Sequence, residues 1–205
     1  MNKTMKKKIL KVLALVACAV LLVVGSIAGT LAYMTSLTGT VTNTFTVGNV
    51  AITLDESKVT VYGVKDGDTR VTTNEYKLIP GHTYVKDPTI HVATESEDCW
   101  LFVKVENGIA GIEADGENVT TNTIQEQMAA NWTAVVGQTG VYAYNTKVSG
   151  GANVVVFNDF TIAGNAVVAG YASANINVTA YAVQADGFET AAEAWAAAPT
   201  AWTQG

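Results

Sequence analysis

Short runs rich in Val, Ile, Thr, Phe and Tyr recur along the chain, and Gly, Asn and Asp residues separate them. Runs of this kind are typical of β-strands, and their close spacing is typical of an antiparallel β-sandwich. We therefore expect an all-β domain with strands at residues 41–47, 50–54, 58–64, 70–77, 82–92, 99–107, 132–136, 140–146, 153–162 and 174–183. Turn residues predict reversals of the chain at 65–68 (KDGD), 79–82 (IPGH), 106–108, 113–118 and 148–153.

Two short helices are expected to interrupt the strands, because the motif Thr-x-x-Glu occurs twice, as TIQE at 123–126 and TAAE at 190–193. In this capping box the Thr side chain accepts from a backbone N–H, and the Glu side chain reaches back to the cap residue. The second helix, within 188–198, is too short to persist alone in water. We expect an aromatic side chain to dock it against a sheet, with three candidates: Phe188, Trp195 and Trp202.

The first 32 residues have the order of a secretory signal peptide, with five lysines, an apolar run at 12–24, and then small residues. A retained membrane anchor is the alternative, but it usually needs about 20 apolar residues, and this run is shorter. Two positions fit the cleavage pattern, after Ala28 and after Ala32. The sequence therefore predicts a signal peptide at 1–32 and a single secreted domain at 33–205, which meets the membrane only through the uncleaved signal.

The charge balance restricts the partners of the secreted domain. The whole chain carries a net charge of −6, with 12 Lys and Arg against 18 Asp and Glu. Removing residues 1–32 removes five of these cations and no anion, which leaves −11 (7 − 18). Nucleic acids and anionic membranes are bound by clustered Lys and Arg, so neither is an expected partner. Cys18 leaves with the signal, and Cys99 then has no partner for an intrachain disulfide.

The segment just behind the signal combines a strand pattern with a change of phase. Its apolar residues first alternate with threonines, and after Gly48 and Asn49 the apolar set moves to even positions, beginning with Val50. A strand has a period of two, so the change requires a bend or bulge, and Gly-Asn suits one. Either one strand switches between sheets at this hinge, or residues 33–47 form a separable arm whose apolar side consists of Val41, Phe45 and Val47.

Such an arm is released only when the signal peptide is cut. A free strand with one apolar side can complete its own sheet or the open edge of a neighbouring molecule. Burial of three apolar side chains stabilises by roughly 5–8 kcal/mol, whereas association of two subunits costs roughly 4–15 kcal/mol. Side-chain burial alone therefore does not determine whether the arm pairs with its own sheet or with the sheet of another molecule. Both alternatives stay open.

Several blocks of the sequence resemble one group of bacterial proteins: GTLAYMTS, TNTFTVGNVAITLDE, YKLIPGHTYVKDPTIHV, EDCWLFVKVEN and NVTAYAVQADGFETAAEAW. Together they resemble the secreted proteins whose signal peptides are cut by the SipW-type signal peptidase, the TasA-like and camelysin-like proteins of biofilm matrices. The resemblance covers nearly the whole chain. Two departures are the absence of an acidic cluster after the cleavage site and the Ala-rich tail.

The resemblance implies a jelly-roll-like sandwich, export, and cleavage between Ala32 and Tyr33 by a SipW-type signal peptidase. It also implies a structural role in the extracellular matrix or at the cell surface. There the N-terminal strand of one subunit would complete the sheet of the next, in fibres of this chain alone or together with related matrix proteins. We expect a structural protein, not an enzyme.

Two alternatives are weighed against this expectation. Camelysin-like proteins are classed as metallopeptidases, but the His-Glu-x-x-His helix is missing. His82 and His91 stand nine residues apart in one predicted strand, which would place them on opposite faces. Cys99 lies among apolar residues and is expected to be a small buried hydrophobe. No catalytic, cofactor or metal site is expected.

The second alternative is a monomeric module that presents an aromatic side chain to a glycan: Trp100, Trp132 or Tyr142.

Overall fold

The computed structural model describes residues 35–38, 50–114 and 123–198. The chain divides into two units between Tyr33 and Met34, and all described residues belong to the second unit. They form eleven strands: β1 Thr35–Thr38, β2 Ile52–Val59, β3 Lys65–Val71, β4 Thr83–Val85, β5 Thr89–Val92, β6 Cys99–Asn107, β7 Trp132–Ala134, β8 Val141–Tyr144, β9 Asn153–Val155, β10 Asp159–Thr161 and β11 Ile176–Gln184. They also form the helices α2 Ile124–Met128 and α3 Ala191–Ala196 and the 3-10 turns η1 Ala110–Ile112 and η2 Val168–Tyr171.

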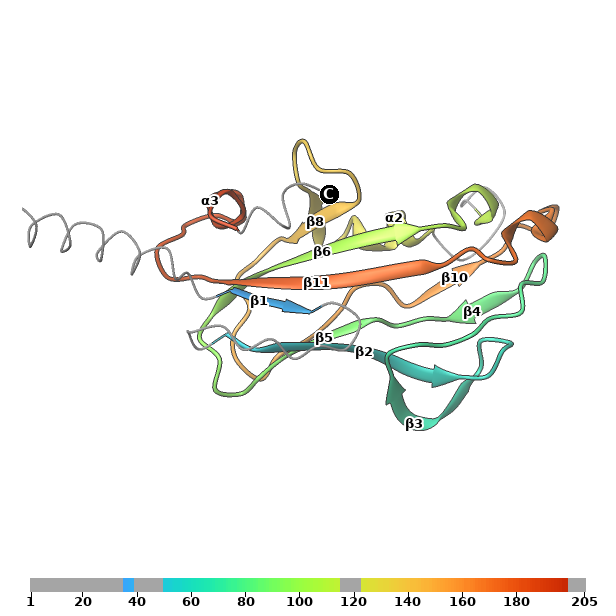
Figure 1. Ribbon diagram of the computed structural model, residues 1–205, viewed down its shortest axis with the longest axis horizontal. Helices are drawn as coiled ribbons and strands as arrows, with labels where there is room; N and C mark the ends of the chain where they lie inside the picture. The colour runs from blue at the N-terminus through green and yellow to red at the C-terminus, as the bar shows by residue number, and fades with distance from the viewer. Residues whose placement is uncertain (1–34, 39–49, 115–122, 199–205) are drawn as a thin grey trace, which may run out of the picture. The chain divides into compact units, whose positions relative to one another are not determined.

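All strand pairs are antiparallel, and they form two main sheets. The larger sheet has the order β1-β11-β6-β8-β7, the second has the order β3-β2-β5-β9, and a two-stranded ribbon joins β10 and β4. Figure 1 shows β6 and β11 in one layer and β2 and β5 in the other. The expectation of an all-β, antiparallel, sandwich-like fold with two short helices is confirmed.

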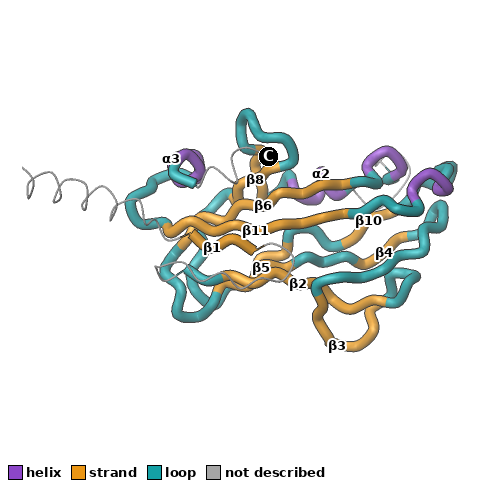
Figure 2. The backbone as a smooth tube through the Cα atoms, in the orientation of Figure 1, coloured by secondary structure: helices purple, strands orange, loops and turns teal. Residues whose placement is uncertain are grey.

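The main core lies between the two layers because alternate residues of each strand point inward. In β6, Leu101 and Val103 are fully buried in this core, where they join Ile90 of the facing sheet. The residues between them, such as Phe102, enter a second cluster on the outer face of the larger sheet. A strand that is apolar on both faces must be covered on both, and α3 supplies part of the outer cover (Figure 2).

Both helices begin at the predicted capping boxes. The Thr123 side chain accepts from Glu126 N, and the Thr190 side chain accepts from Glu193 N, with each Glu bonding back to its cap residue. Trp195 docks α3, since its ring centroid lies 5.0 Å from that of Phe102. The prediction of an aromatic anchor is thus confirmed for Trp195, whereas Trp202 lies outside the described residues.

Two predicted strands are each split into two. The predicted strand at 82–92 becomes β4 and β5, and that at 153–162 becomes β9 and β10. The breaks lie side by side, because Lys86 N donates to Asn158 O (3.1 Å) and Val156 N donates to Pro88 O (2.8 Å). Pro88 has no N–H to offer a regular ladder, which favours a break at this point.

The predicted turn at 65–68 lies inside β3 instead, and the strand predicted at 70–77 ends at Val71. The chain reverses earlier, around Gly63, which has a φ of +72°. The pairing of β2 with β3 shifts its register between Ser57 and Val59, so that residues 66–69 bulge out of the ladder. Gly67, with a φ of +74°, is therefore part of a bulge and not of a hairpin turn.

Candidate functional site

The most distinctive feature of the sandwich is a strand edge that is only half covered. β1 pairs with the end of β11, with Thr35 opposite Val183 and Thr38 opposite Ala180. In the part of the chain that the structure describes, no strand pairs with residues 176–179 of β11 on the side away from β6. Among the described residues, the outer edge of β11 is thus unpaired over positions 176–179.

A second free edge faces the first across the sandwich. Residues Ile52–Asp55 of β2 pair with β5 on one side, whereas β3 pairs with β2 only from Glu56 onward. Among the described residues, no strand is hydrogen-bonded to the other side of Ile52–Asp55. The two exposed edges are the rims of one opening between the sheets.

An open groove of about 1370 Å³ lies between these rims. Thr53–Glu56 form one wall, and Asn175–Thr179 form the other. Its apolar lining is half-buried and packs directly on the main core: Leu54, Tyr76, Leu78, Val168, Tyr171, Ala174, Ile176 and Val178. A groove with apolar walls, and with two edges that no described strand pairs with, is suited to an extended peptide, which needs both side-chain burial and ladder hydrogen bonds.

A buried ion pair lies in the lining of this groove. Lys86 Nζ is 2.7 Å from Glu56 Oε2, and the two side chains are 10% and 6% exposed. Asn74 Nδ2 donates to Glu56 Oε1 (3.0 Å), and Lys86 Nζ lies 5.8 Å from the centre of the Tyr76 ring. Burial, followed by the carboxylates of Glu56 and Asp87, raises the pKa of Tyr76. Tyr76 therefore remains a neutral phenol, and its hydroxyl donates to Val85 O (3.2 Å).

A second polar cluster ties β3 to the β2 rim. Asp87 accepts from Ser57 N (2.6 Å) and from Ser57 Oγ (2.7 Å), and Lys65 Nζ lies 3.3 Å from its Oδ2. Arg70 donates to the Asp55 carboxylate and to the carbonyl of Asp87 (3.2 Å). Burial alone would raise the pKa of Asp87, but the bonds from Ser57 and Lys65 and the Arg70 charge hold it below its usual value.

The two histidines do not share one strand, so the predicted arrangement of His82 and His91 on opposite faces of a single strand is wrong. His82 precedes β4, and its Nε2 lies 2.8 Å from Tyr62 O. His91 lies in β5, with Nε2 2.8 Å from Asp55 Oδ1 and Nδ1 2.6 Å from Asn153 Oδ1. Within residues 35–38, 50–114 and 123–198, no three His, Cys, Asp or Glu residues are grouped to hold a metal ion.

Cys99 is fully buried, as the sequence predicts. Burial, with a contribution from Asp98, raises the pKa of its thiol to about 12. The thiolate is the reactive form of cysteine, so Cys99 is a packing residue and not a nucleophile.

The aromatic residues considered for glycan binding are not displayed at the surface. Trp100 and Trp132 are buried, and Tyr142 is half-buried against the main core. Trp100 is further covered by Lys147, whose Nζ lies 5.7 Å from the ring centre. Neither tryptophan offers an open ring face to a sugar.

The site residues predicted at the N-terminus lie outside the described residues. They are Ala32 and Tyr33 of the cleavage site, Val41, Phe45 and Val47 of the arm, and Gly48 and Asn49 of the hinge. The sequence patterns did not predict the groove itself. One signal for it was available: Glu56 continues the apolar series Ile52 and Leu54 of one strand face, and so places a charge where a core residue is expected.

A comparison with protein-family models, with curated proteins and with solved structures finds no match for this chain. In the described part of the chain, no helix has the length and apolar character needed to cross a membrane.

Proposed function

We propose that this chain is an exported structural protein whose groove between β2 and β11 accepts an extended β-strand, so that copies assemble into fibres of an extracellular matrix. The observation that carries the proposal is that no described strand pairs with the outer edge of residues 176–179, next to an apolar groove. An exposed edge of a central strand is a template for pairing with another chain, and soluble monomers usually cover such edges.

The pairing of β1 with β11 supports the N-terminal arm as the strand that is added. β1 begins two residues after Tyr33, the first residue expected after cleavage, and already occupies the β11 edge at residues 180–183. The same contact made by the arm of a second copy would be a strand exchange, which keeps the interface and changes only which chain supplies the strand. In fibres, each subunit would then cover the edge of the next.

The register of β1 adds a constraint on the arm. If it continued unchanged past Thr38, Val41 would stand opposite Asn177, which is exposed. Its neighbours Ile176 and Val178 are the residues that pack on the core. For Val41, Phe45 and Val47 to enter the groove, the arm must shift by one residue, because strand faces alternate with a period of two. Binding of these three side chains in the groove therefore requires a register one residue away from that of β1.

The remaining assignments follow the same proposal. The jelly-roll-like topology, the cut between Ala32 and Tyr33 by a SipW-type signal peptidase, and the extracellular location rest on the resemblance to TasA-like proteins. A role without catalysis or cofactor is part of the same proposal and rests on the sequence, which lacks a His-Glu-x-x-His helix.

The decisive experiment compares the secreted chain with a chain that lacks residues 33–47. We expect fibres, seen by electron microscopy and light scattering, only from the complete secreted chain. A synthetic peptide of residues 33–49 should bind to the truncated chain and protect from hydrogen exchange those amides within 176–179 that point away from β6. Circular dichroism establishes that the truncated chain is folded. Fibre formation by the folded, truncated chain at the rate of the complete one would overturn the proposal.

A matched pair of substitutions tests the groove itself. Val178→Glu places a charge on the core side of the free edge, whereas Asn177→Glu places the same charge on the exposed side one residue away. Only Val178→Glu should weaken peptide binding. Equal binding of the peptide by both variants, with both folded, would show that the strand is bound elsewhere.

A further inference from the structure

An exposed apolar patch lies at one end of the groove. It consists of Val61, Tyr62, Val64 and Ile79, which are between 37% and 59% exposed. Val61 also lines the groove, so the patch continues the surface on which the added strand would lie. We call these four residues the tip patch. Large apolar side chains gathered on a soluble surface are a common mark of an interface.

The tip patch is held rigidly by backbone contacts. Thr60 N donates to Val64 O (2.8 Å), Lys77 N donates to Val61 O (2.8 Å), and Val85 N donates to Gly63 O (3.0 Å). Gly63 packs so closely on Tyr84 that a Cβ at this position would lie 2.6 Å from Tyr84 Cα. A rigid surface loses little conformational entropy on binding, which suits it to a specific contact.

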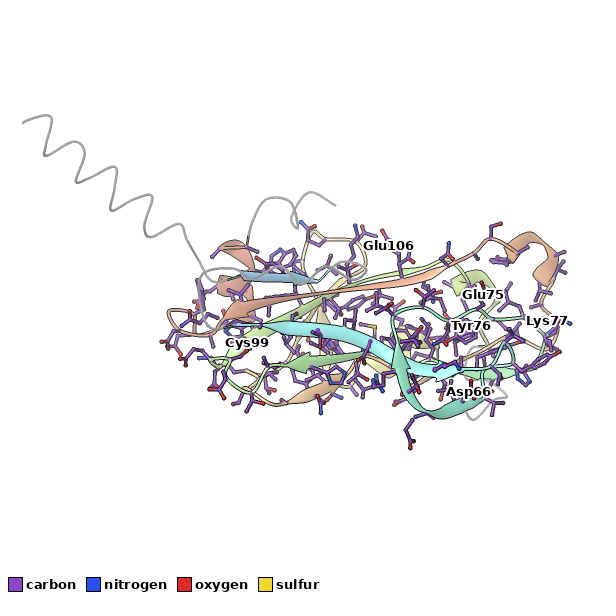
Figure 3. All side chains as sticks on the ribbon, turned by 60° about the horizontal axis from the view of Figure 1, so that its bottom comes forward. Asp66, Glu75, Tyr76, Lys77, Cys99 and Glu106 are labelled. Atoms are coloured by element: carbon purple, nitrogen blue, oxygen red, sulfur yellow. The ribbon has the colours of Figure 1, made fainter. Side chains whose placement is uncertain are left out.

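The charges beside the tip patch include one cation with no close carboxylate. Lys77 is exposed, its Nζ lies 6.0 Å from the centre of the Tyr62 ring, and no Asp or Glu of the described residues lies within 4 Å of it. Lys58 and Lys65, by contrast, are paired with Asp66 and Asp87. Glu75 is exposed on the same segment, and Figure 3 shows it near Tyr76 and Lys77, at the end of the domain away from Cys99.

The opposite end of the domain carries an acidic turn beside the point where the arm joins the body. The turn at 93–98 is bonded to Ala51, since Ala93 N donates to Ala51 O (2.8 Å) and Ala51 N donates to Ser96 Oγ (3.0 Å). Its carboxylates are exposed and have no ion-pair partner among the described residues: Glu95, Glu97 and Asp98. Lys147, over the Trp100 ring, is the nearby cation on the adjoining β8–β9 segment.

The direction of β1 determines which ends would meet in an assembly. β1 is antiparallel to β11, so a strand that continues past Thr38 runs toward Ile176 and leaves the groove at the tip-patch end. Figure 1 shows the start of β11 and the β2–β3 connection at this end, and the β5–β6 connection at the other. Residues 39–49 can span at most about 40 Å when extended. The short connection therefore keeps the body of the donating copy, which begins at Val50, within this reach of the tip-patch end of the groove.

From this we infer a second contact in the fibre: the acidic 93–98 turn of each copy docks on the tip patch and Lys77 of the copy that accepts its arm. The inference rests on the proposed strand exchange and adds a specific partner surface to it. The negative charge of the 93–98 turn complements the positive charge of Lys77. The apolar side chains of the tip patch would be covered by the donating copy. The occupant is a second copy of this chain, placed there by the short connection to its arm.

A charge-exchange series in the secreted chain tests this contact. Glu95→Lys with Glu97→Lys, or Lys77→Glu alone, should each raise the concentration needed for assembly by about fivefold, as expected for loss of a close charge contact. The chain that carries all three changes should assemble nearly as well as the unaltered chain, because the charges are restored across the contact. Lys104→Glu, on the outer face of the larger sheet, should leave assembly unchanged.

The apolar part is tested separately with Tyr62→Ala and Val64→Ser, which should also slow assembly. Binding of the 33–49 peptide should be unaffected in these variants and in the Glu95 and Glu97 variants, because the groove is intact. If the arm is required but every one of these variants assembles like the unaltered chain, the docking contact is wrong and the proposed function stands. Assembly that does not require the arm, or no assembly at all, would overturn both.

Discussion

Lys86 Nζ lies 2.7 Å from Glu56 Oε2 in the lining of the groove, and both side chains are nearly buried. The two residues are 30 positions apart in the chain, and their ion pair links β2 to the connection between β4 and β5. A buried charge is tolerated when it is paired, but it becomes strongly unfavourable when its partner is removed. The wall of the groove therefore depends on this pair being complete.

Removing one partner of the pair should be worse than removing both. We expect Lys86→Met to lower the free energy of unfolding by about 3–5 kcal/mol, because Glu56 is left buried without its cation. The double variant Glu56→Gln, Lys86→Met should recover a large part of this loss. Urea denaturation followed by tryptophan fluorescence measures both. A double variant that is less stable than Lys86→Met would contradict the explanation.

Two glycines with similar backbone angles offer a matched comparison. Gly63 and Gly67 have φ values of +72° and +74°, but only Gly63 is packed against another residue, Tyr84. Gly67→Ala should cost about 1 kcal/mol for the left-handed conformation alone. Gly63→Ala should cost clearly more, since the added Cβ meets the Tyr84 backbone. Thermal unfolding of both variants is the measurement, and equal losses would show that Tyr84 moves aside.

Stability should fall in acid partly through Asp87. Its pKa is held below the usual value of 3.8, so its contribution is present above this pH and is lost as the pH falls through the lower folded value. Asp87→Asn should therefore be less stable than the unaltered chain at pH 7, and the difference should shrink on acidification below pH 3.8.

Glu113 provides a control of opposite sign. Burial is the main cause that raises the pKa of its carboxyl, although Ile124 N and Asn107 donate to it. The folded state thus binds a proton at Glu113 more readily than the unfolded state, so Glu113 makes the free energy of unfolding rise as the pH falls toward its usual pKa. Glu113→Gln should remove this rise. If Asp87→Asn and Glu113→Gln change the pH profile in the same direction, one of the two assignments is wrong. Urea denaturation at a series of pH values separates them.

The thiol of Cys99 should be inert in the folded protein. Because it is fully buried and its pKa is raised to about 12, a thiol reagent at pH 8 should label it only when the chain unfolds. The labelling rate should rise in step with the unfolding rate as urea is added. Fast labelling of the folded chain, or disulfide-linked dimers in fibres, would show that Cys99 is accessible.

The sequence by itself determined the features that are local. The short apolar run at 99–103 predicts β6, because the composition and length of a run need no knowledge of the partner strand. The capping boxes at Thr123 and Thr190 were equally readable, since each hydrogen bond joins residues three apart. The aromatic anchor of α3 was narrowed to three candidates by the same reasoning.

Only the tertiary structure decided where strands break and which edges remain free. Pro88 was visible in the sequence, but the paired breaks of 82–92 and 153–162 depend on contacts between segments about 70 residues apart. The bulge of β3 around Gly67 likewise follows from its register on β2. The groove follows from the incomplete pairing of β11 and β2, and the charge of Glu56 is acceptable in its lining only because Lys86 reaches it. The pairing of distant strands is not specified by neighbouring residues in the sequence. The strand breaks, the bulge and the groove therefore depend on contacts that exist only in the folded sheets.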